Sequence, residues 1–151
     1  MNYFEALGIP IRYNIDEDAL TRTYLQKQAL LHPDVNDAES ERSAFLNKAY
    51  KILLSPLDRA GYFLEIHKRH SDNLDAEFTF EAFNLREQYE TLESSKDKKS
   101  FHDTLSRRIF ELVTTLRNLE DNLDEFQKNY GLLRFIASFL EKIKSDVYSW
   151  N

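Results

Sequence analysis

The sequence has no cysteine, and its 151 residues include only three glycines and three prolines. The absence of cysteine excludes disulfides and thiolate metal sites, and it fits a reducing compartment. The scarcity of glycine and proline favours helices joined by few turns. No apolar run approaches the roughly 20 residues that a membrane-spanning helix needs, and no basic, apolar leader opens the chain. We therefore expect a soluble, cytoplasmic protein without a membrane partner.

Acidic residues outnumber basic ones. The chain has 20 lysine and arginine residues against 26 aspartate and glutamate residues, which gives a net charge of −6. Nucleic acids and anionic membranes attract basic proteins, so this balance argues against either as the main partner. Hydrophobic residues make up 42% of the chain, which is enough to bury a core. The length suits one ordinary domain or two small ones.

The residues that are present predict an all-α fold. Asn2, Asp16 and Ser55 are good N-caps, because their side-chain oxygens can accept hydrogen bonds from the free amides of a first helical turn. Gly8 suits the left-handed conformation that ends many helices, and Pro56 suits a first helical position. These signals predict four N-terminal helices: about 2–7, about 16–31, a third after a polar loop at about 36–40, and a fourth from residue 55.

Apolar residues recur at helical spacing on the second and third of these helices, which predicts an antiparallel helical hairpin. The two stripes are Leu20, Tyr24 and Leu31, and Leu46, Ala49, Tyr50 and Leu53. The tripeptide His32-Pro33-Asp34 joins the two helices. Proline disfavours helical geometry in the residue before it, so we expect an imidazole and a carboxylate on an exposed turn. By itself, the tripeptide also suits an ordinary helix end with a turn-capping aspartate.

A polar stretch from His67 to Leu74 contains Ser71-Asp72-Asn73, a plausible hinge, and we divide the chain into domains 1–70 and 71–151. Three longer helical patterns follow it, and short turns join them. Antiparallel neighbours are joined in this way, so this half is predicted to be an antiparallel three-helix bundle. The apolar stripes of its last two helices are Phe101, Leu105, Ile109, Leu112, Leu116, Leu119 and Leu123, and then Phe126, Tyr130, Leu133, Ala137 and Leu140.

The first helix of that bundle carries phenylalanines on its polar side. At about 100° per residue, one face suits the core, and it consists of Phe78, Ala82, Leu85, Tyr89 and Leu92. The opposite face consists of Phe80, Phe83, Asn84, Glu87 and Thr91, and Phe135 lies about 180° from Phe126 on the last helix. Such rings suit either a partner surface or packing against the N-terminal domain. Residues 75–93 contain six acids and one base, so a partner with basic residues would complement them.

The first 65 residues resemble a J-domain, the activating module of DnaK-type chaperone ATPases. The resemblance rests on Tyr24-Leu25 before the tripeptide His32-Pro33-Asp34, and on Leu46-Asn47-Lys48-Ala49-Tyr50, Leu53, Pro56, Arg59 and Tyr62. Further motifs are similar to the HscB family of iron–sulfur cluster co-chaperones: Tyr3-Phe4, Leu7-Gly8-Ile9-Pro10, Leu85-Arg86-Glu87 and Leu133-Arg134-Phe135. The resemblance covers essentially the whole chain.

The HscB resemblance implies a co-chaperone rather than an enzyme, with no cofactor and no metal of its own. Its J-domain would stimulate ATP hydrolysis by an HscA-type chaperone, and its bundle would present the scaffold protein IscU to that ATPase. The ATPase would contact His32, Pro33, Asp34, Arg22 and Lys27. The IscU-type scaffold would contact Phe80, Phe83, Asn84, Glu87, Thr91 and Phe135.

The sequence departs from the family pattern at several of these positions. Residues 16–31 contain three acids against two bases, and Val35 stands where the family often has lysine. Arg22 and Lys27 would therefore also suit two ordinary solvated bases. Asn84 and Thr91 replace residues that are often acidic.

Other functions are also open. The chain could be a J-domain co-chaperone for different protein clients. A hydrolase that uses His32 and Asp34 would need a nucleophile and an oxyanion site, and the sequence suggests neither. His67 and His70 could share a helix face as metal ligands, but no third ligand is evident.

Overall fold

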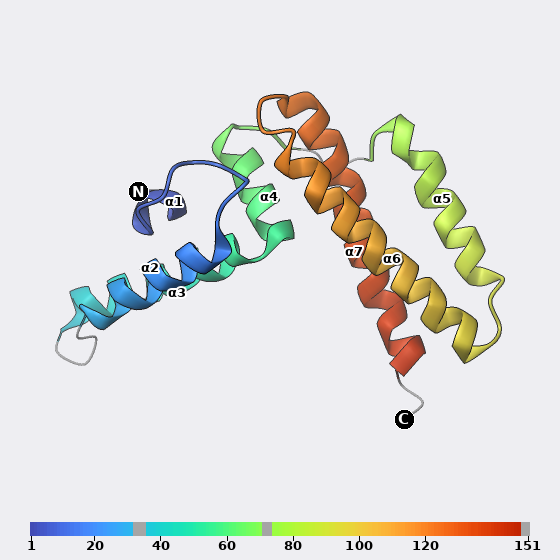
Figure 1. Cartoon of the computed structure of the whole chain (residues 1–151), viewed down its shortest axis with the longest axis horizontal. Coiled ribbons are helices and arrows are strands. Elements are labelled where there is room, and N and C mark those ends of the chain that lie inside the picture. Colours follow the sequence, from blue (N-terminus) through green and yellow to red (C-terminus); the bar gives the residue numbers. More distant parts are fainter. Residues whose placement is uncertain (32–35, 71–73, 149–151) are drawn as a thin grey trace. The chain divides into compact units, whose positions relative to one another are not determined.

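The computed structural model describes residues 1–31, 36–70 and 74–148, and the regular structure of these residues is entirely helical (Figure 1). The chain divides into two compact units, Met1–His67 and Lys68–Asn151. The first unit contains α1 (Tyr3–Ala6), α2 (Glu17–Ala29), α3 (Asp37–Leu54) and α4 (Pro56–Ile66). The second contains α5 (Ala76–Glu90), α6 (Ser95–Arg117) and α7 (Leu123–Tyr148). The predicted all-α fold is confirmed.

Side-chain caps begin α1, α2 and α4 where the sequence predicts them. Asn2 and Glu5 form a reciprocal capping box at α1, and Asp16 accepts a hydrogen bond from the amide of Ala19 at 3.1 Å. Ser55 caps α4, whose first residue is proline. Gly8 follows α1 with a φ of 66°, a conformation that costs glycine little. These local contacts satisfy amides that no earlier turn of helix can satisfy.

The predicted loop at residues 36–40 is wrong. Asn36 is itself the N-cap of α3, and its Oδ1 accepts a hydrogen bond from the amide of Glu39 at 2.9 Å. The helix begins at Asp37, so its first turn carries acidic side chains that favour a helix N-terminus. The predicted hinge residues, 71–73, lie outside the described residues.

The core of the first unit lies where α1, α3 and the start of α2 meet. Its fully buried side chains include those of Phe4, Leu7, Leu20, Ala49 and Leu53. Leu46 is also buried, whereas the predicted core residues Tyr24, Tyr50 and Leu31 are partly exposed. The burial of Leu20 and Leu53 confirms that the apolar stripes of α2 and α3 face each other.

In the second unit, α6 and α7 pack side by side along their length, and α5 packs against α7 (Figure 1). The stripe predicted for α6 is confirmed at Phe101, Leu105, Leu112 and Leu116, which are all buried. The stripe predicted for α7 is wrong in part, because Tyr130, Ala137 and Leu140 are only half-buried. The buried apolar residues of α7 are Phe126, Leu132, Leu133, Ile136, Phe139 and Ile143. Two helices cover α7, so its buried arc is wider than a single stripe.

No helix within the described ranges is both long and apolar enough to cross a membrane.

Candidate functional site

The tripeptide His32-Pro33-Asp34 lies outside the described residues, so the helices on either side define its setting. α2 ends at Ala29, two residues earlier than predicted, and Leu30 is its C-cap. α3 begins at Asp37. Few residues therefore connect the two helix ends, and the contacts between α2 and α3 determine how rigidly those ends are held.

Polar contacts link α2 to α3 along the hairpin. Gln28 Nε2 donates to the Ser43 carbonyl at 2.9 Å, the Tyr24 hydroxyl donates to Asn47 Oδ1, and the Thr21 and Tyr50 hydroxyls lie 2.9 Å apart. These contacts pair the end of α2 with the first half of α3 and the start of α2 with the second half of α3, so the helices are antiparallel as predicted. The rings of Tyr24 and Tyr50 also stack, with centroids 4.1 Å apart and planes 4° apart.

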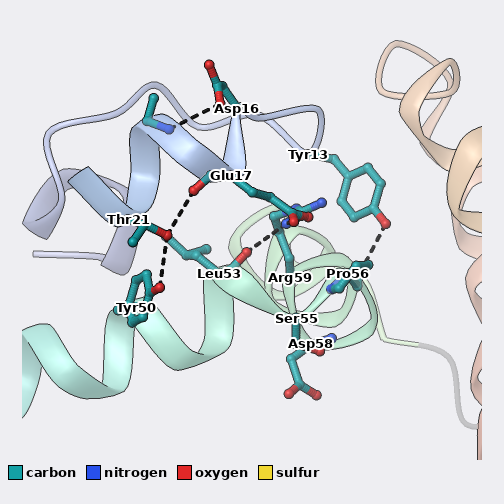
Figure 2. A network of polar contacts seen from close by, with 11 residues as sticks. Tyr13, Asp16, Glu17, Thr21, Tyr50, Leu53, Ser55, Pro56, Asp58 and Arg59 are labelled. Atoms are coloured by element: carbon teal, nitrogen blue, oxygen red, sulfur yellow. Dashed lines mark hydrogen bonds and ion pairs between the residues drawn. The ribbon is translucent and has the colours of Figure 1, made fainter. Parts of the chain in front are cut away.

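Arg59 holds the other end of the hairpin together (Figure 2). Its side chain is completely buried, and Nη1 donates to the Leu53 carbonyl at 2.7 Å and to Glu17 Oε1 at 3.3 Å. The guanidinium lies 4.8 Å from the ring centroid of Tyr13, whose hydroxyl donates to the Pro56 carbonyl at 3.1 Å. A buried charge is costly unless it is paired, so this network ties the start of α2 to the corner between α3 and α4.

Arg22 and Lys27, the two bases predicted to contact the ATPase, do not share a face of α2. Five positions separate them, which places their side chains about 140° apart around the helix axis. Arg22 is exposed, whereas Lys27 is half-buried. A Cβ atom added to Gly8 would lie 3.8 Å from Lys27 Cε, so this lysine reaches across to the turn after α1.

On α5, the structure confirms the predicted division into two faces. Phe80 and Phe83 are 72% and 59% exposed, large fractions for phenylalanine. Glu87 is exposed on the same helix, and so is Thr91, the C-cap, whose hydroxyl donates to the Gln88 carbonyl at 2.8 Å. Asn84 is half-buried at the border of this face. The exposed rings and polar groups form a surface that a partner protein could cover.

Phe135 differs from the other two phenylalanines. The helical period places it opposite the core residue Phe126, yet the residue is half-buried and its ring stacks on Phe139 with centroids 6.1 Å apart. The Arg86 guanidinium lies 5.4 Å from the centroid of the Phe135 ring, within the range of a cation–π interaction. Arg86 joins the Phe135 ring of α7 to the α5 surface.

Polar side chains hold α5 on the bundle. Arg108 of α6 donates from Nε and Nη2 to the two carboxylate oxygens of Glu81, at 2.9 and 3.2 Å. The Tyr89 hydroxyl donates to Asp146 Oδ2 of α7 at 2.7 Å. Burial raises the pKa of Tyr89 to about 12, with smaller contributions from this hydrogen bond and from the charge of Asp146. These contacts position the exposed face of α5.

Sequence reasoning missed the roles of Arg59 and Arg86. Arg59 appears in the J-domain pattern, but its burial depends on contacts with Glu17 and Tyr13, which are distant in sequence. Arg86 had a signal, since it is the one base among residues 75–93.

Among the described residues, no three histidine or acidic side chains gather to hold a metal ion. His67 Nδ1 lies 2.7 Å from the Phe63 carbonyl oxygen.

The chain is similar to known co-chaperones over nearly all of its length. It is 29% identical to the co-chaperone protein HscB of Proteus mirabilis (strain HI4320) in an alignment of 163 residues that covers 95% of this chain and 94% of the relative. No protein-family model matches the chain.

Solved structures of co-chaperones have the same fold. Human HscB superposes with a TM-score of 0.81 at 25% identity, over 99% of this chain and 83% of the human chain. HscB from Vibrio cholerae gives a TM-score of 0.75 at 24% identity, over 97% and 99% of the two chains. Jac1 from Saccharomyces cerevisiae gives 0.78 at 20% identity, over 95% and 92%, and these last two likenesses concern the fold alone. The sequence similarity together with the shared fold supports an HscB-type co-chaperone, a regulator of a chaperone rather than an enzyme.

Proposed function

We propose that this co-chaperone acts in iron–sulfur cluster assembly in the cytoplasm. In this proposal, the first unit is a J-domain that stimulates ATP hydrolysis by an HscA/DnaK-type chaperone through His32, Pro33 and Asp34. The second unit binds an IscU-type scaffold protein and brings it to that chaperone. The observation that carries the proposal is the combination, in one HscB-like fold, of a firmly held helical hairpin that ends at the tripeptide and an α5 face with two exposed phenylalanines.

The chemical task of the J-domain is to favour one state of its partner. A co-chaperone raises the rate of hydrolysis only if it binds the hydrolysis-competent state of the ATPase more tightly than the other states. A tenfold rise corresponds to about 1.4 kcal/mol of such differential binding. In this proposal, the imidazole of His32 and the carboxylate of Asp34 supply this energy through a few polar contacts, provided that the hairpin does not yield. The stacked tyrosines and the buried Arg59 support this rigidity.

The scaffold would be held on the α5 face, with Phe80 and Phe83 as anchors. Both rings are exposed, so covering them would remove apolar area from water at little cost to the fold. Glu87 and the other acids of residues 75–93 would meet basic residues of the scaffold, while Asn84 and Thr91 would offer uncharged polar contacts. Phe135 would contribute the edge of a ring that Arg86 already covers in part.

Joining the two interfaces in one chain has a further consequence. A scaffold held on α5 stays close to any ATPase that is held by the first unit, so its effective concentration there rises without a new contact. Arg22 and Lys27 would add some electrostatic attraction to the ATPase. Since these bases lie on different sides of a helix with three acids at its start, we propose that this attraction is modest.

The experiment that tests the proposal is an ATPase assay with the full chain, an HscA/DnaK-type chaperone and an IscU-type scaffold. The wild-type chain should stimulate hydrolysis, and the scaffold should increase the stimulation. His32→Gln should abolish stimulation while scaffold binding and the midpoint of thermal unfolding stay unchanged, because the sequence predicts a turn at the tripeptide that contributes little to the core. Full stimulation by this variant would contradict the J-domain mechanism. Unchanged stimulation on addition of scaffold would contradict delivery.

A further inference from the structure

An open groove lies in the first unit, between the N-terminal residues, the last turn of α2 and the first half of α3. Its volume is about 920 Å³. Leu31 and Leu46 form its base, and the more exposed Leu30 and Phe45 form its sides. Lys27 and Arg42 also line it. None of the proposed contacts of the tripeptide or of α5 accounts for this surface.

The spacing of the lining residues shows that two helix faces were turned toward the same space. Leu30 and Leu31 come three and four positions after Lys27 at the C-terminal end of α2, and Phe45 and Leu46 come three and four positions after Arg42 on α3. Leu30 is 78% exposed and Phe45 is 37% exposed. Adjacent exposed apolar side chains with a polar border are typical of protein interaction sites.

The border of the groove is mainly basic. Lys27 and Arg42 come from facing helices, and Glu41 is the acid that lines the groove beside them. A segment that fits must therefore present apolar side chains to the leucines and a carboxylate to the bases.

We propose that the groove is a second contact for the chaperone ATPase and that it takes a short apolar segment of the ATPase bearing an acidic residue. This inference rests on the proposed function, because it assumes that the tripeptide contacts the ATPase. Leu30 and Leu31 immediately precede His32 in the chain, so a protein that covers the tripeptide lies next to the groove. Apolar contact there offsets the weak attraction expected of a helix whose bases are split between two sides.

The first test compares two exposed leucines of the same helix in the full chain. Leu30→Ser removes an apolar side of the groove, whereas Leu25→Ser removes a leucine that is 59% exposed and lies about 140° away around α2. Loss of a hot-spot side chain weakens binding by about tenfold, so Leu30→Ser should raise the co-chaperone concentration for half-maximal ATPase stimulation by that factor. Leu25→Ser should change it less than about twofold. Equal effects of the two variants, or no effect of Leu30→Ser, would overturn the proposal.

The second test separates the charge from the apolar contact. Arg42→Gln should weaken stimulation at low salt and should approach the wild type at high salt, because salt screens an attraction between exposed charges. Leu30→Ser should be weaker than the wild type at every salt concentration. A wild-type salt dependence in Arg42→Gln would overturn the assignment of an acidic residue to the occupant.

The outcomes also distinguish this inference from the proposed function. If the wild-type chain stimulates no hydrolysis, the proposed function itself is wrong. If the wild type stimulates, His32→Gln does not, and Leu30→Ser equals the wild type, only the groove is wrong. The remaining candidate occupant of the groove is a second copy of this chain. Sedimentation of the co-chaperone alone tests it, since a dimer that Leu30→Ser dissociates would assign the groove to that second copy. Circular dichroism of each variant checks that it is folded.

Discussion

α2 and α5 have similar proposed tasks but are attached to their units in different ways. Each is an outer helix that borders or carries a proposed interface, and among the described residues each contributes one buried side chain. In α2 this side chain is Leu20, and in α5 it is Ala82. A helix that offers one face to a partner has only its other face to hold it in place. The residues of that inner face therefore decide how rigidly the interface is presented.

The two inner faces differ in what they bury. Burying a leucine contributes about 1.5–3 kcal/mol, and an alanine has far less area to bury. α2 adds a tyrosine stack and the Glu17–Arg59 contact to Leu20. α5 relies on partly exposed polar groups, Glu81 with Arg108 and Tyr89 with Asp146, and such pairs are weak individually. We infer that α2 presents a rigid surface to the ATPase, whereas α5 can open locally without global unfolding.

The largest expected effect comes from truncating one leucine on each helix. Leu20→Ala should destabilise the first unit by about 2–5 kcal/mol, because it leaves a cavity in a fully packed site. Leu85→Ala, at a half-buried position, should cost only about 1–2 kcal/mol, because part of that side chain is already in water. Urea unfolding followed by hydrogen exchange resolved along the chain would assign each loss to its unit. Equal losses would contradict the distinction between the two inner faces.

The next effect concerns binding rather than stability. Phe80→Ala and Phe83→Ala should each weaken scaffold binding by about 1–3 kcal/mol and should change the free energy of unfolding by less than about 0.5 kcal/mol. Phe110→Ala is the matched control, because Phe110 is 72% exposed, as Phe80 is, but lies on α6. Calorimetry with an IscU-type scaffold measures the binding. A loss with Phe110→Ala as large as that with Phe80→Ala would remove the scaffold-binding assignment from α5.

These expectations combine features that the sequence reveals with features that it does not. The N-caps at Asn2, Asp16 and Ser55 were predictable because a cap depends on residues three or four positions apart. The exposure of Phe80 and Phe83 was predictable because the helical period places both residues opposite the apolar stripe of the same helix. Features that depend only on residues within one helix can therefore be predicted from the sequence.

Features that depend on a neighbouring helix were predicted less well. The half-burial of Phe135 follows from packing by α5 as well as α6, and the period of α7 alone does not report a second neighbour. The helical period alone predicts that Arg22 and Lys27 lie on different sides of α2. The position of Lys27 beside Gly8, however, depends on the path of the chain between α1 and α2. The tripeptide assignment stays a prediction, because those residues lie outside the described ranges.

A smaller effect would test how α2 is attached. Glu17→Gln removes the negative charge that pairs with the buried Arg59 guanidinium, so it should lower the free energy of unfolding by about 1 kcal/mol. Asp18→Asn is the control, because this neighbouring acid is exposed and also lies in the first turn of α2. Both variants lose one negative charge near the helix N-terminus, so their difference isolates the contact with Arg59. If the two losses measured by urea unfolding are the same, the Arg59 network does not stabilise α2.

The smallest expected effect is the pH dependence of the contact between α5 and α7. The pKa of Tyr89 is raised to about 12 from its ordinary value of 10.0. Because the folded chain favours the neutral phenol, the resulting stabilisation is complete below pH 10 and is lost as the pH rises toward 12. Tyr89→Phe should cost about 0.5 kcal/mol at neutral pH, since the lost hydrogen bond is exposed. The difference between the wild type and this variant should shrink above pH 10.

Asp146→Asn determines which cause of this pKa shift is the larger. The variant removes the negative charge but leaves Tyr89 packed against Phe101 and Phe139. Since burial is the main cause of the shift, the pKa of Tyr89 should fall only part of the way from about 12 toward 10.0. The ultraviolet absorbance of tyrosinate, taken as the difference between Asp146→Asn chains with and without Tyr89→Phe, measures that pKa. A return to 10.0 would mean that Asp146 alone raises the pKa, and that Tyr89 is too loosely packed to help hold α5 on the bundle.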